Sequence, residues 1–265
     1  MSKPEYRISP SILNSFQSLI DSDAIWEEYW GGSDDPPMTA EEFAVKQEKD
    51  LIDSINRVKK EPIEAADKGT CLNYIVDEMV QRGCDNPKGV AVTRIFNDDD
   101  PREVIGLKAE LNGFSFPFDI RLCTALASYF SGSVPQYRCE ATLPTKYGDV
   151  ILYGDADYIR KDIVYDLKTT KQYKYGKFAK GWQKDLYPYC LIEGGEMSFI
   201  TEFEYTVVPL TGGTGGNLIT GEIFRERYDY NHGASTLRLK GIVESFVMWL
   251  KQHRHLITHP RIFNQ

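Results

Sequence analysis

The spacing of apolar residues predicts helices in the first third of the chain. After Ser9-Pro10, a helix-start signal, apolar side chains recur every three or four residues, as on one face of a helix. Thr39 begins a capping-box pattern, which predicts a second helix at about 40–59. A third apolar stripe predicts a helix at about 68–82.

After about residue 88 the pattern becomes that of a sheet. Short β-branched segments alternate with turn residues, and Asn112-Gly113 is a strong signal for a tight hairpin. The order of helices, a β-meander, a helix, further strands and a last helix indicates an α/β (α+β mixed) fold, with a mixed sheet flanked by helices. The expected strand regions are about 89–96, 104–118, 136–145, 149–159, 163–168, 197–208 and 218–228, and the later helices are about 119–131, 177–192 and 233–253.

The size of the chain suits one domain. Its 265 residues, 42% apolar and 26% charged, can bury one sizeable core. We expect a single domain over 1–265, with a core at about 68–208 and a helical N-terminal elaboration at 1–67.

The sequence has no run of about 18 apolar residues and no apolar leader, so we expect a cytoplasmic protein without membrane association.

Charge is distributed unevenly along the chain. The net charge of −8 argues against a general polyanion binder. The segment from Lys168 to Lys184 is an exception, because it holds six lysines, no acidic residue and several aromatic residues. Lysines can neutralise phosphates and exposed aromatic rings can stack on unpaired bases. Lys171 and Lys174 are the candidates for phosphate contacts, whereas a solvated face with core aromatics explains about half of the segment.

Two neighbouring predicted strands carry the candidate chemistry. Asp166 and Lys168 are two residues apart in one strand, so their side chains share a face. Asp157 lies on the preceding strand across a short turn and is expected to approach Asp166. Two converging carboxylates need a cation between them, and hard oxygen ligands suit Mg²⁺ or Mn²⁺. Such a metal activates water, Lys168 can orient that water, and the carbonyl of Leu167 is a candidate further ligand.

The same residues also have a simpler interpretation. An Asp and a Lys two apart on a strand are common and often form only a surface ion pair. The surrounding sequence favours the functional interpretation, because three motifs follow one another on the expected strand, strand and helix. These motifs are Gly154-Asp155-Ala156-Asp157, Asp166-Leu167-Lys168-Thr169 and Gln183-Lys184-Asp185-Leu186-Tyr187.

Together the three motifs resemble those of the PD-(D/E)xK nuclease superfamily, specifically its RecB-like and Cas4-like exonuclease branch. The family pattern is G-x-x-D, then D/E-x-K-T, then Q-x-x-x-Y on the next helix. The resemblance implies that Asp157, Asp166 and Lys168 are catalytic. Gln183 and Tyr187 share one helix face, and the resemblance implies that this face, together with Thr169, lies toward the DNA.

The resemblance also implies a fold, a cofactor and a substrate. We expect a restriction-endonuclease-like αβββαβ core, Mg²⁺ or Mn²⁺ as cofactor, and DNA as a linear duplex or single strand. The five cysteines lack the spacing for an iron–sulfur cluster, so none is expected. The expected protein is a metal-dependent deoxyribonuclease, an exonuclease of recombination, repair or phage DNA processing, with a recombination or repair protein as a candidate partner. The oligomeric state stays open.

One position departs from the family pattern. The segment from Lys68 to Asn73 resembles G-T-x-x-H, in which the histidine binds metal, but this chain has Asn73 there. An amide oxygen binds a hard cation more weakly than a charged ligand does. Either Asn73 still contributes, or Glu140 on an earlier strand substitutes, or activity is impaired. A catalytically weak nucleic-acid-binding protein is therefore the alternative, and an unrelated α+β interaction protein with chance motifs is the third hypothesis.

Overall fold

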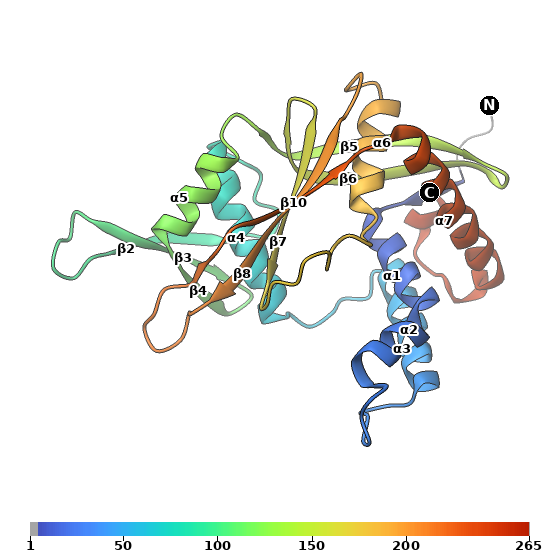
Figure 1. Ribbon diagram of the computed structural model, residues 1–265, viewed down its shortest axis with the longest axis horizontal. Helices are drawn as coiled ribbons and strands as arrows, with labels where there is room; N and C mark the ends of the chain where they lie inside the picture. The colour runs from blue at the N-terminus through green and yellow to red at the C-terminus, as the bar shows by residue number, and fades with distance from the viewer. Residues whose placement is uncertain (1–4, 265) are drawn as a thin grey trace.

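A central mixed sheet flanked by helices forms the body of the protein, in a computed structural model that describes residues 5–264 (Figure 1). The mixed α/β class expected from the sequence is therefore correct. The helices are α1 (Pro10–Ile20), α2 (Ser22–Trp30), α3 (Ala40–Ile55), α4 (Glu64–Val80), α5 (Ile120–Tyr129), α6 (Gln183–Glu193) and α7 (His232–Gln252), followed by short 3₁₀ turns at Arg254–Leu256 and Pro260–Phe263. The strands are β1 (Tyr6–Ile8), β2 (Ala91–Phe96), β3 (Val104–Leu111), β4 (Phe114–Asp119), β5 (Val134–Thr145), β6 (Gly148–Arg160), β7 (Ile163–Thr170), β8 (Glu202–Thr211), β9 (Thr220–Gly221) and β10 (Phe224–Asp229).

Strand β6 organises the central sheet. It pairs antiparallel with β5 along one side. On its other side, its first half pairs parallel with β1 and its last residues pair antiparallel with β7. Strand β7 continues the sheet through a parallel pairing with β8, and β8 pairs antiparallel with β10. The parallel β7–β8 pair requires a crossover, which the chain makes through the 171–182 segment and α6.

Two hydrophobic cores lie on the two faces of this sheet. Helices α6 and α7 cover one face, where Phe246 and Leu186 are fully buried. Helices α4 and α5 and the small sheet β2–β3–β4 cover the other face, where Tyr158, Tyr165 and Phe118 are buried. The Asn112-Gly113 hairpin between β3 and β4 forms as expected, with positive φ at both residues.

Helices α1, α2 and α3 form an arm at one end of the molecule (Figure 1). Its base is tied to the core, because Leu13 and Phe16 of α1 are buried in the α7 side of the core. The capping box at the start of α3 is present, with Thr39 accepting from the Glu42 N–H at 3.2 Å. The sequence pattern did not predict α2, which follows α1 almost without a break.

Several expected boundaries differ from the structure, and three of the differences are the clearest. The helix expected at about 177–192 begins only at Gln183, because residues 175–180 form turns, in which the Ala179 N–H donates to the Gly176 carbonyl at 3.1 Å. The strand expected from 197 begins at Glu202, where its neighbour β7 begins and supplies hydrogen-bond partners. The strand expected at about 218–228 is split into β9 and β10. Of the three, the start of β8 is set by pairing with a neighbouring strand.

Two further properties concern the described chain as a whole. No helix within residues 5–264 has the length and apolar content that crossing a bilayer requires. All five cysteines are free thiols, and Cys71, Cys123, Cys139 and Cys190 are buried.

Candidate metal centre and active site

The candidate site lies where β6 and β7 separate. The two strands pair only through the last residues of β6, from Tyr158, and the first residues of β7. Ala156 packs in the α6–α7 core and Tyr158 packs in the α4–α5 core, so the alternation of side chains along β6 breaks at Asp157. Opposite this break, Gln136 of β5 has a positive φ of 48° and is skipped in the β5–β6 register. Asp157 therefore leaves the regular ladder and turns toward β7.

The Asp157 carboxylate takes the place of a backbone acceptor. Its Oδ2 accepts a hydrogen bond from the Leu167 N–H at 2.8 Å. In an extended strand the N–H and C=O of one residue point toward the same side. The Leu167 carbonyl therefore faces the same gap between β6 and β7 as the Asp157 side chain. A carboxylate oxygen and a carbonyl oxygen thus border one small space.

Asp166 and Lys168 lie on the face of β7 opposite to its core residues. Tyr165 and Leu167 are buried among the α4–α5 side of the core, as strand alternation requires. Asp166 is 2% exposed, and its Oδ2 lies 2.6 Å from the Lys168 Nζ. That oxygen nevertheless lacks a hydrogen bond of good geometry, so the contact is an ion pair only. The structure thus brings Asp157, Asp166 and Lys168 together.

The electrostatics of the cluster favour a bound cation. Burial, followed by the charge of Asp166, raises the pKa of Asp157 to about 8. Burial by itself lowers the pKa of Lys168, but the charges of Asp166 and Asp157 outweigh it and raise that pKa above its ordinary value. Lys168 is therefore an ammonium group at neutral pH. One lysine does not fully offset two buried carboxylates, since Asp157 still resists ionisation.

Helix α4 supplies a third wall of the site. Gly69 lies against β7, since a Cβ there would be 2.6 Å from the Thr169 Oγ1. Asp77 lies two turns later against β6, where it accepts a hydrogen bond from the Tyr158 hydroxyl at 2.6 Å. Asn73 is four residues from each, so it shares their helix face and lies between these two contacts. Its Oδ1 is buried and has no hydrogen-bond partner.

The oxygen atoms at this place fit a hard divalent cation. The candidate donors are the carboxylates of Asp157 and Asp166, the Asn73 Oδ1 and the Leu167 carbonyl. The Asn73 Oδ1 is buried without a hydrogen bond, which is costly unless a ligand compensates it, and the Asp166 Oδ2 has only its ion pair with Lys168. Within residues 5–264 no cluster of three or more His, Cys, Asp or Glu side chains could hold a metal. A cation here would therefore use two carboxylates and neutral oxygens, a set suited to Mg²⁺ or Mn²⁺.

Tyr187 of the third motif packs against the first motif. A Cβ at Gly154 would lie 2.5 Å from the Tyr187 ring, so the close approach requires glycine. Burial raises the pKa of Tyr187, and the charges of Asp166 and Asp157 raise it further. The phenol is thus close enough to sense both carboxylates. Gln183, at the first turn of α6, instead accepts a hydrogen bond from the Asn14 side chain at 3.1 Å.

Glu140 is not part of this cluster. It pairs with Tyr153 in the β5–β6 register, four residues from the position opposite Asp157, which is about 13 Å along a strand. Its side chain is half exposed and forms an ion pair with Arg7. The structure therefore does not bring Glu140 to the metal site as a substitute for the missing histidine.

Asp77 is the acidic residue near the site that the sequence reasoning missed. It is 4% exposed, and burial raises its pKa to about 6 although Tyr158 and Gln136 donate hydrogen bonds to it. Its charge also contributes to the raised pKa of Asp157. The available signal was its spacing, because an acid four residues after Asn73 must share that residue's helix face.

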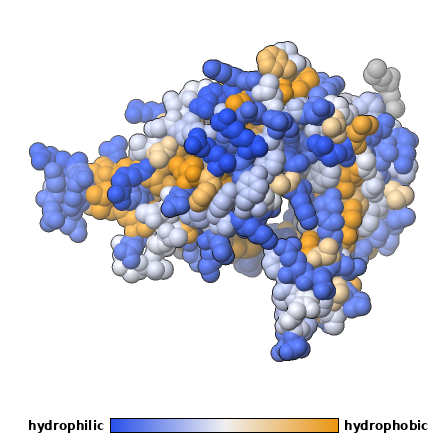
Figure 2. Space-filling view, in the orientation of Figure 1, coloured by the Kyte–Doolittle hydropathy of each residue, from blue (hydrophilic) through white to orange (hydrophobic). Residues whose placement is uncertain are grey.

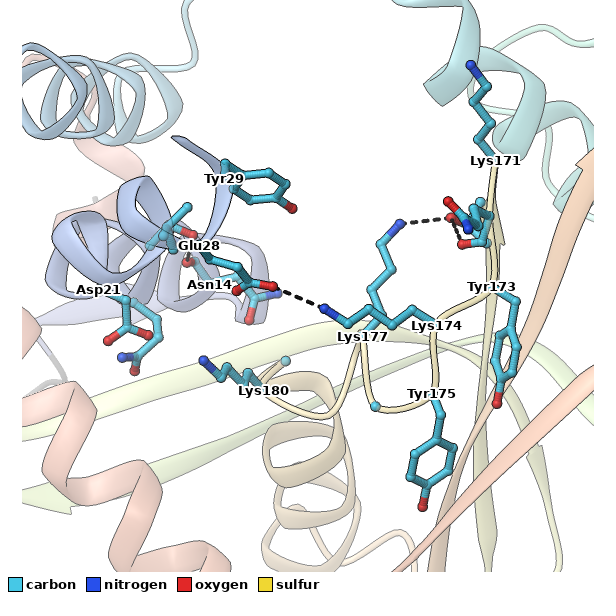
Figure 3. A pocket seen from close by; sticks show the side chains of 17 residues that line it. Asn14, Asp21, Glu28, Tyr29, Lys171, Tyr173, Lys174, Tyr175, Lys177 and Lys180 are labelled. Carbon is cyan, nitrogen blue, oxygen red and sulfur yellow. Dashed lines mark hydrogen bonds and ion pairs between the residues drawn. The ribbon is translucent and has the colours of Figure 1, made fainter. Parts of the chain in front are cut away.

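The DNA-binding candidates after β7 line an open cleft. The cleft lies between helices α1–α2 and the segment 170–181, and its volume is about 1200 Å³ (Figure 3). Lys171 and Lys174 both line it, and Lys174 forms an ion pair with Glu28 at 3.1 Å across the cleft. Figure 2 shows the molecule hollowed between the helical arm and the body, with mainly hydrophilic residues at the border.

Comparison with known proteins adds one structural similarity. No family model matches the sequence, and no curated protein matches it. A solved structure described as "Crystal structure of SSO0001" is similar over 94% of this chain and 79% of that chain. The identity is 10% and the TM-score is 0.42, which is too low to support a conclusion about fold family or function.

Proposed function

We propose that the protein is a divalent-metal-dependent nuclease that hydrolyses DNA phosphodiester bonds. The observation that carries the proposal is the convergence of Asp157, Asp166 and Lys168 at the separation of β6 and β7. The order α4, β5–β7, α6 and β8 supports the proposal, because it is the αβββαβ order expected of the core, with β2–β4 and α5 inserted and α1–α3 added at the front. An exonuclease of recombination, repair or phage DNA processing suits this assignment.

The residues of the site have distinct roles in the proposed reaction. A bound Mg²⁺ or Mn²⁺ supplies Lewis-acid activation of water and neutralises charge on the phosphate. Asp157 and Asp166, with the Leu167 carbonyl and the Asn73 Oδ1, would hold it. Lys168 is an ammonium group beside Asp166, so it can donate to the attacked phosphate and offset developing negative charge.

Contacts between the three motifs position these groups. Tyr187 is buried on the α6 side, where the charges of Asp166 and Asp157 raise its pKa, so its ring would limit the access of water from that side. The close packing of Gly154 on the Tyr187 ring fixes the distance between β6 and α6. Hydrogen bonding of Asp157 to the Leu167 N–H fixes one carboxylate relative to the strand that carries the other. The site is therefore held rigidly before any substrate binds.

A catalytically weak nucleic-acid-binding protein is the second candidate, and the Asn73 position favours it. A neutral amide oxygen binds a hard cation less strongly than a charged ligand, and Glu140 lies elsewhere. The adjacent carboxyl groups of Asp157 and Asp166 favour the nuclease, because placing two acids side by side is costly for a protein that does not bind a cation there.

Cleavage assays on end-labelled linear duplex and single-stranded DNA with Mn²⁺ or Mg²⁺ separate the two candidates. We expect wild-type protein to degrade DNA, and Asp166→Asn and Lys168→Gln each to lower the rate by roughly 100- to 1000-fold. Asp155→Asn is the matched control, because that acid is exposed on the same strand and pairs with Arg138 at 3.0 Å. Activity that survives Asp166→Asn contradicts the assigned site, whereas binding without cleavage selects the second candidate.

A further inference from the structure

The cleft beside the candidate site has walls of different chemistry. Helices α1 and α2 form one wall, and the segment 170–181 forms the other (Figure 3). The cleft begins at Thr170, only two residues after Lys168. A ligand that fills the cleft therefore reaches the end of β7, where the proposed reaction takes place.

The cleft is locally basic in an acidic protein. Four lysines line it, Lys171, Lys174, Lys177 and Lys180, whereas only Asp21 and Glu28 oppose them. The Lys174–Glu28 pair is exposed on both sides (74% and 60%), so it is weak and a phosphate can displace the carboxylate. Within residues 5–264, Lys171 and Lys180 form no ion pair at all. Their charges are free to bind an anion.

An exposed aromatic ring lies on the wall opposite the lysines. Tyr29 of α2 is 68% exposed and its ring stands at the mouth of the cleft (Figure 3). Tyr173 has a different role, because it stacks on Phe224 at a centroid distance of 4.0 Å and anchors its segment. A ring on one wall and ammonium groups on the other are the two features of a single-strand binding groove.

Both walls are held in place without a ligand. The Gly176 N–H donates to the buried carboxylate of Glu226 at 3.1 Å, which fixes the lysine segment to β10. On the opposite side, Asn14 of α1 accepts from the Trp182 N–H at 2.9 Å and donates to Gln183 at 3.1 Å. The cleft therefore needs little ordering on binding, which favours affinity.

We propose that this cleft binds single-stranded nucleic acid and guides its backbone to the metal centre. The bases of a duplex are stacked on one another, so Tyr29 can stack only on an unpaired base. The walls are close enough for one lysine side chain to span them, since Lys174 reaches Glu28 on the opposite wall at 3.1 Å. The guiding role rests on the proposed function, whereas the binding role does not.

Fluorescence anisotropy in EDTA, where no metal-dependent cleavage occurs, tests the binding role. The probes are a labelled oligo-dT strand and a blunt duplex of equal length, titrated at several salt concentrations. We expect tighter binding of the single strand, and a salt slope that falls in magnitude by about 1.4 in the Lys171→Gln/Lys180→Gln double variant, which loses two phosphate contacts. Tyr29→Ala should weaken binding about tenfold with the slope unchanged. Glu28→Gln should strengthen binding, since it frees Lys174.

Two matched controls lie outside the cleft. Lys161→Gln removes a lysine at the opposite end of β7, and Phe199→Ala removes an aromatic side chain that is 60% exposed. Neither should change binding. Equal affinity for duplex and single strand, or cleft variants that bind like these controls, overturns the proposal.

Parallel cleavage assays with Mn²⁺ separate this proposal from the nuclease assignment. Single-strand binding that depends on Tyr29 and the lysines, without any Asp166-dependent cleavage, supports the cleft and rejects the nuclease. Asp166-dependent cleavage by cleft variants that bind and cut like wild type rejects the cleft and leaves the nuclease in place.

Discussion

At the scale of single residues, the site depends on polar side chains whose hydrogen bonding or charge is incompletely compensated. The Asn73 Oδ1 and the Asp166 Oδ2 lack hydrogen bonds, and burial together with Asp166 raises the pKa of Asp157 to about 8. Such groups destabilise a folded protein unless a ligand compensates them. This is the physical reason to expect metal binding at this place.

Replacement of Asn73 by histidine tests whether the side chain at this position binds the metal. An imidazole binds Mn²⁺ more strongly than a neutral amide oxygen, so Asn73→His should tighten Mn²⁺ binding about tenfold. Asn73→Ala should weaken it, because the oxygen is removed without replacement. Isothermal titration with Mn²⁺ measures both. Equal affinities for wild type and Asn73→Ala contradict a role for this residue in metal binding.

A second residue-scale prediction concerns the contact between the first and third motifs. Gly154→Ala should destabilise the fold by about 1–3 kcal/mol, because the new Cβ would lie 2.5 Å from the Tyr187 ring. Gly241→Ala on α7 is the control, since nothing lies within 4 Å of its Cβ position, and it should stabilise the helix by roughly 0.5–1 kcal/mol. Urea unfolding of the two variants gives the comparison.

At the scale of elements, the separation of β6 from β7 creates the site. The strands share only a short ladder, and Asp157 then supplies the acceptor for the Leu167 N–H that β6 backbone no longer provides. Helix α4 lies across this opening, with Gly69 against β7 and Asp77 against β6. A regular pair of strands would fill the space that the proposed nuclease reaction needs for a cation and a water.

The joint between α1 and α6 gives a prediction at this scale. Asn14→Ala removes both hydrogen bonds that hold α1 to the start of α6, so the arm should loosen. Amide hydrogen exchange should become faster in α1, α2 and the residues around Trp182, with a loss of about 1–2 kcal/mol in stability. Gln17→Ala, one turn along α1, should leave exchange unchanged. Unaltered exchange in the Asn14 variant would show that apolar packing alone holds the arm.

At the scale of the whole molecule, buried acids make stability depend on pH. Burial raises the pKa of Asp77 to about 6 in the folded protein, against an ordinary value of 3.8. The folded state therefore binds the proton more strongly than the unfolded chain. Ionisation of Asp77 therefore destabilises the fold. The loss in free energy of unfolding reaches its maximum of about 3 kcal/mol above about pH 6 and disappears as the pH falls below about 4.

Asp77→Asn isolates this contribution, because the amide stays neutral and keeps an acceptor for the Tyr158 hydroxyl. The variant should be more stable than wild type at pH 7.5, and the difference should shrink toward zero at pH 4. Urea unfolding in EDTA at a series of pH values measures it. A difference that does not change with pH refutes the raised pKa of Asp77.

The sequence by itself determined the order and approximate position of most elements, though not of β1 or α2, because apolar spacing of two or of three to four residues follows from which face must be buried. It also determined that Asp166 and Lys168 share a face, since strand alternation is a property of the backbone. The short turn between the two predicted strands led us to expect Asp157 near Asp166, and these residues do lie together. The class of fold followed from the same patterns.

Only the tertiary structure decided what depends on contacts between distant segments. The break in alternation at Asp157 lies opposite the irregularity at Gln136 on the neighbouring strand, and no local pattern in β6 shows it. Glu140 lies outside the metal site because it pairs with Tyr153 in the β5–β6 register, and that register depends on both strands. The cleft exists because Asn14 holds the N-terminal arm beside a segment more than 150 residues later in the chain. Spacing along one segment is a local property, whereas register and the approach of separate segments are settled by packing.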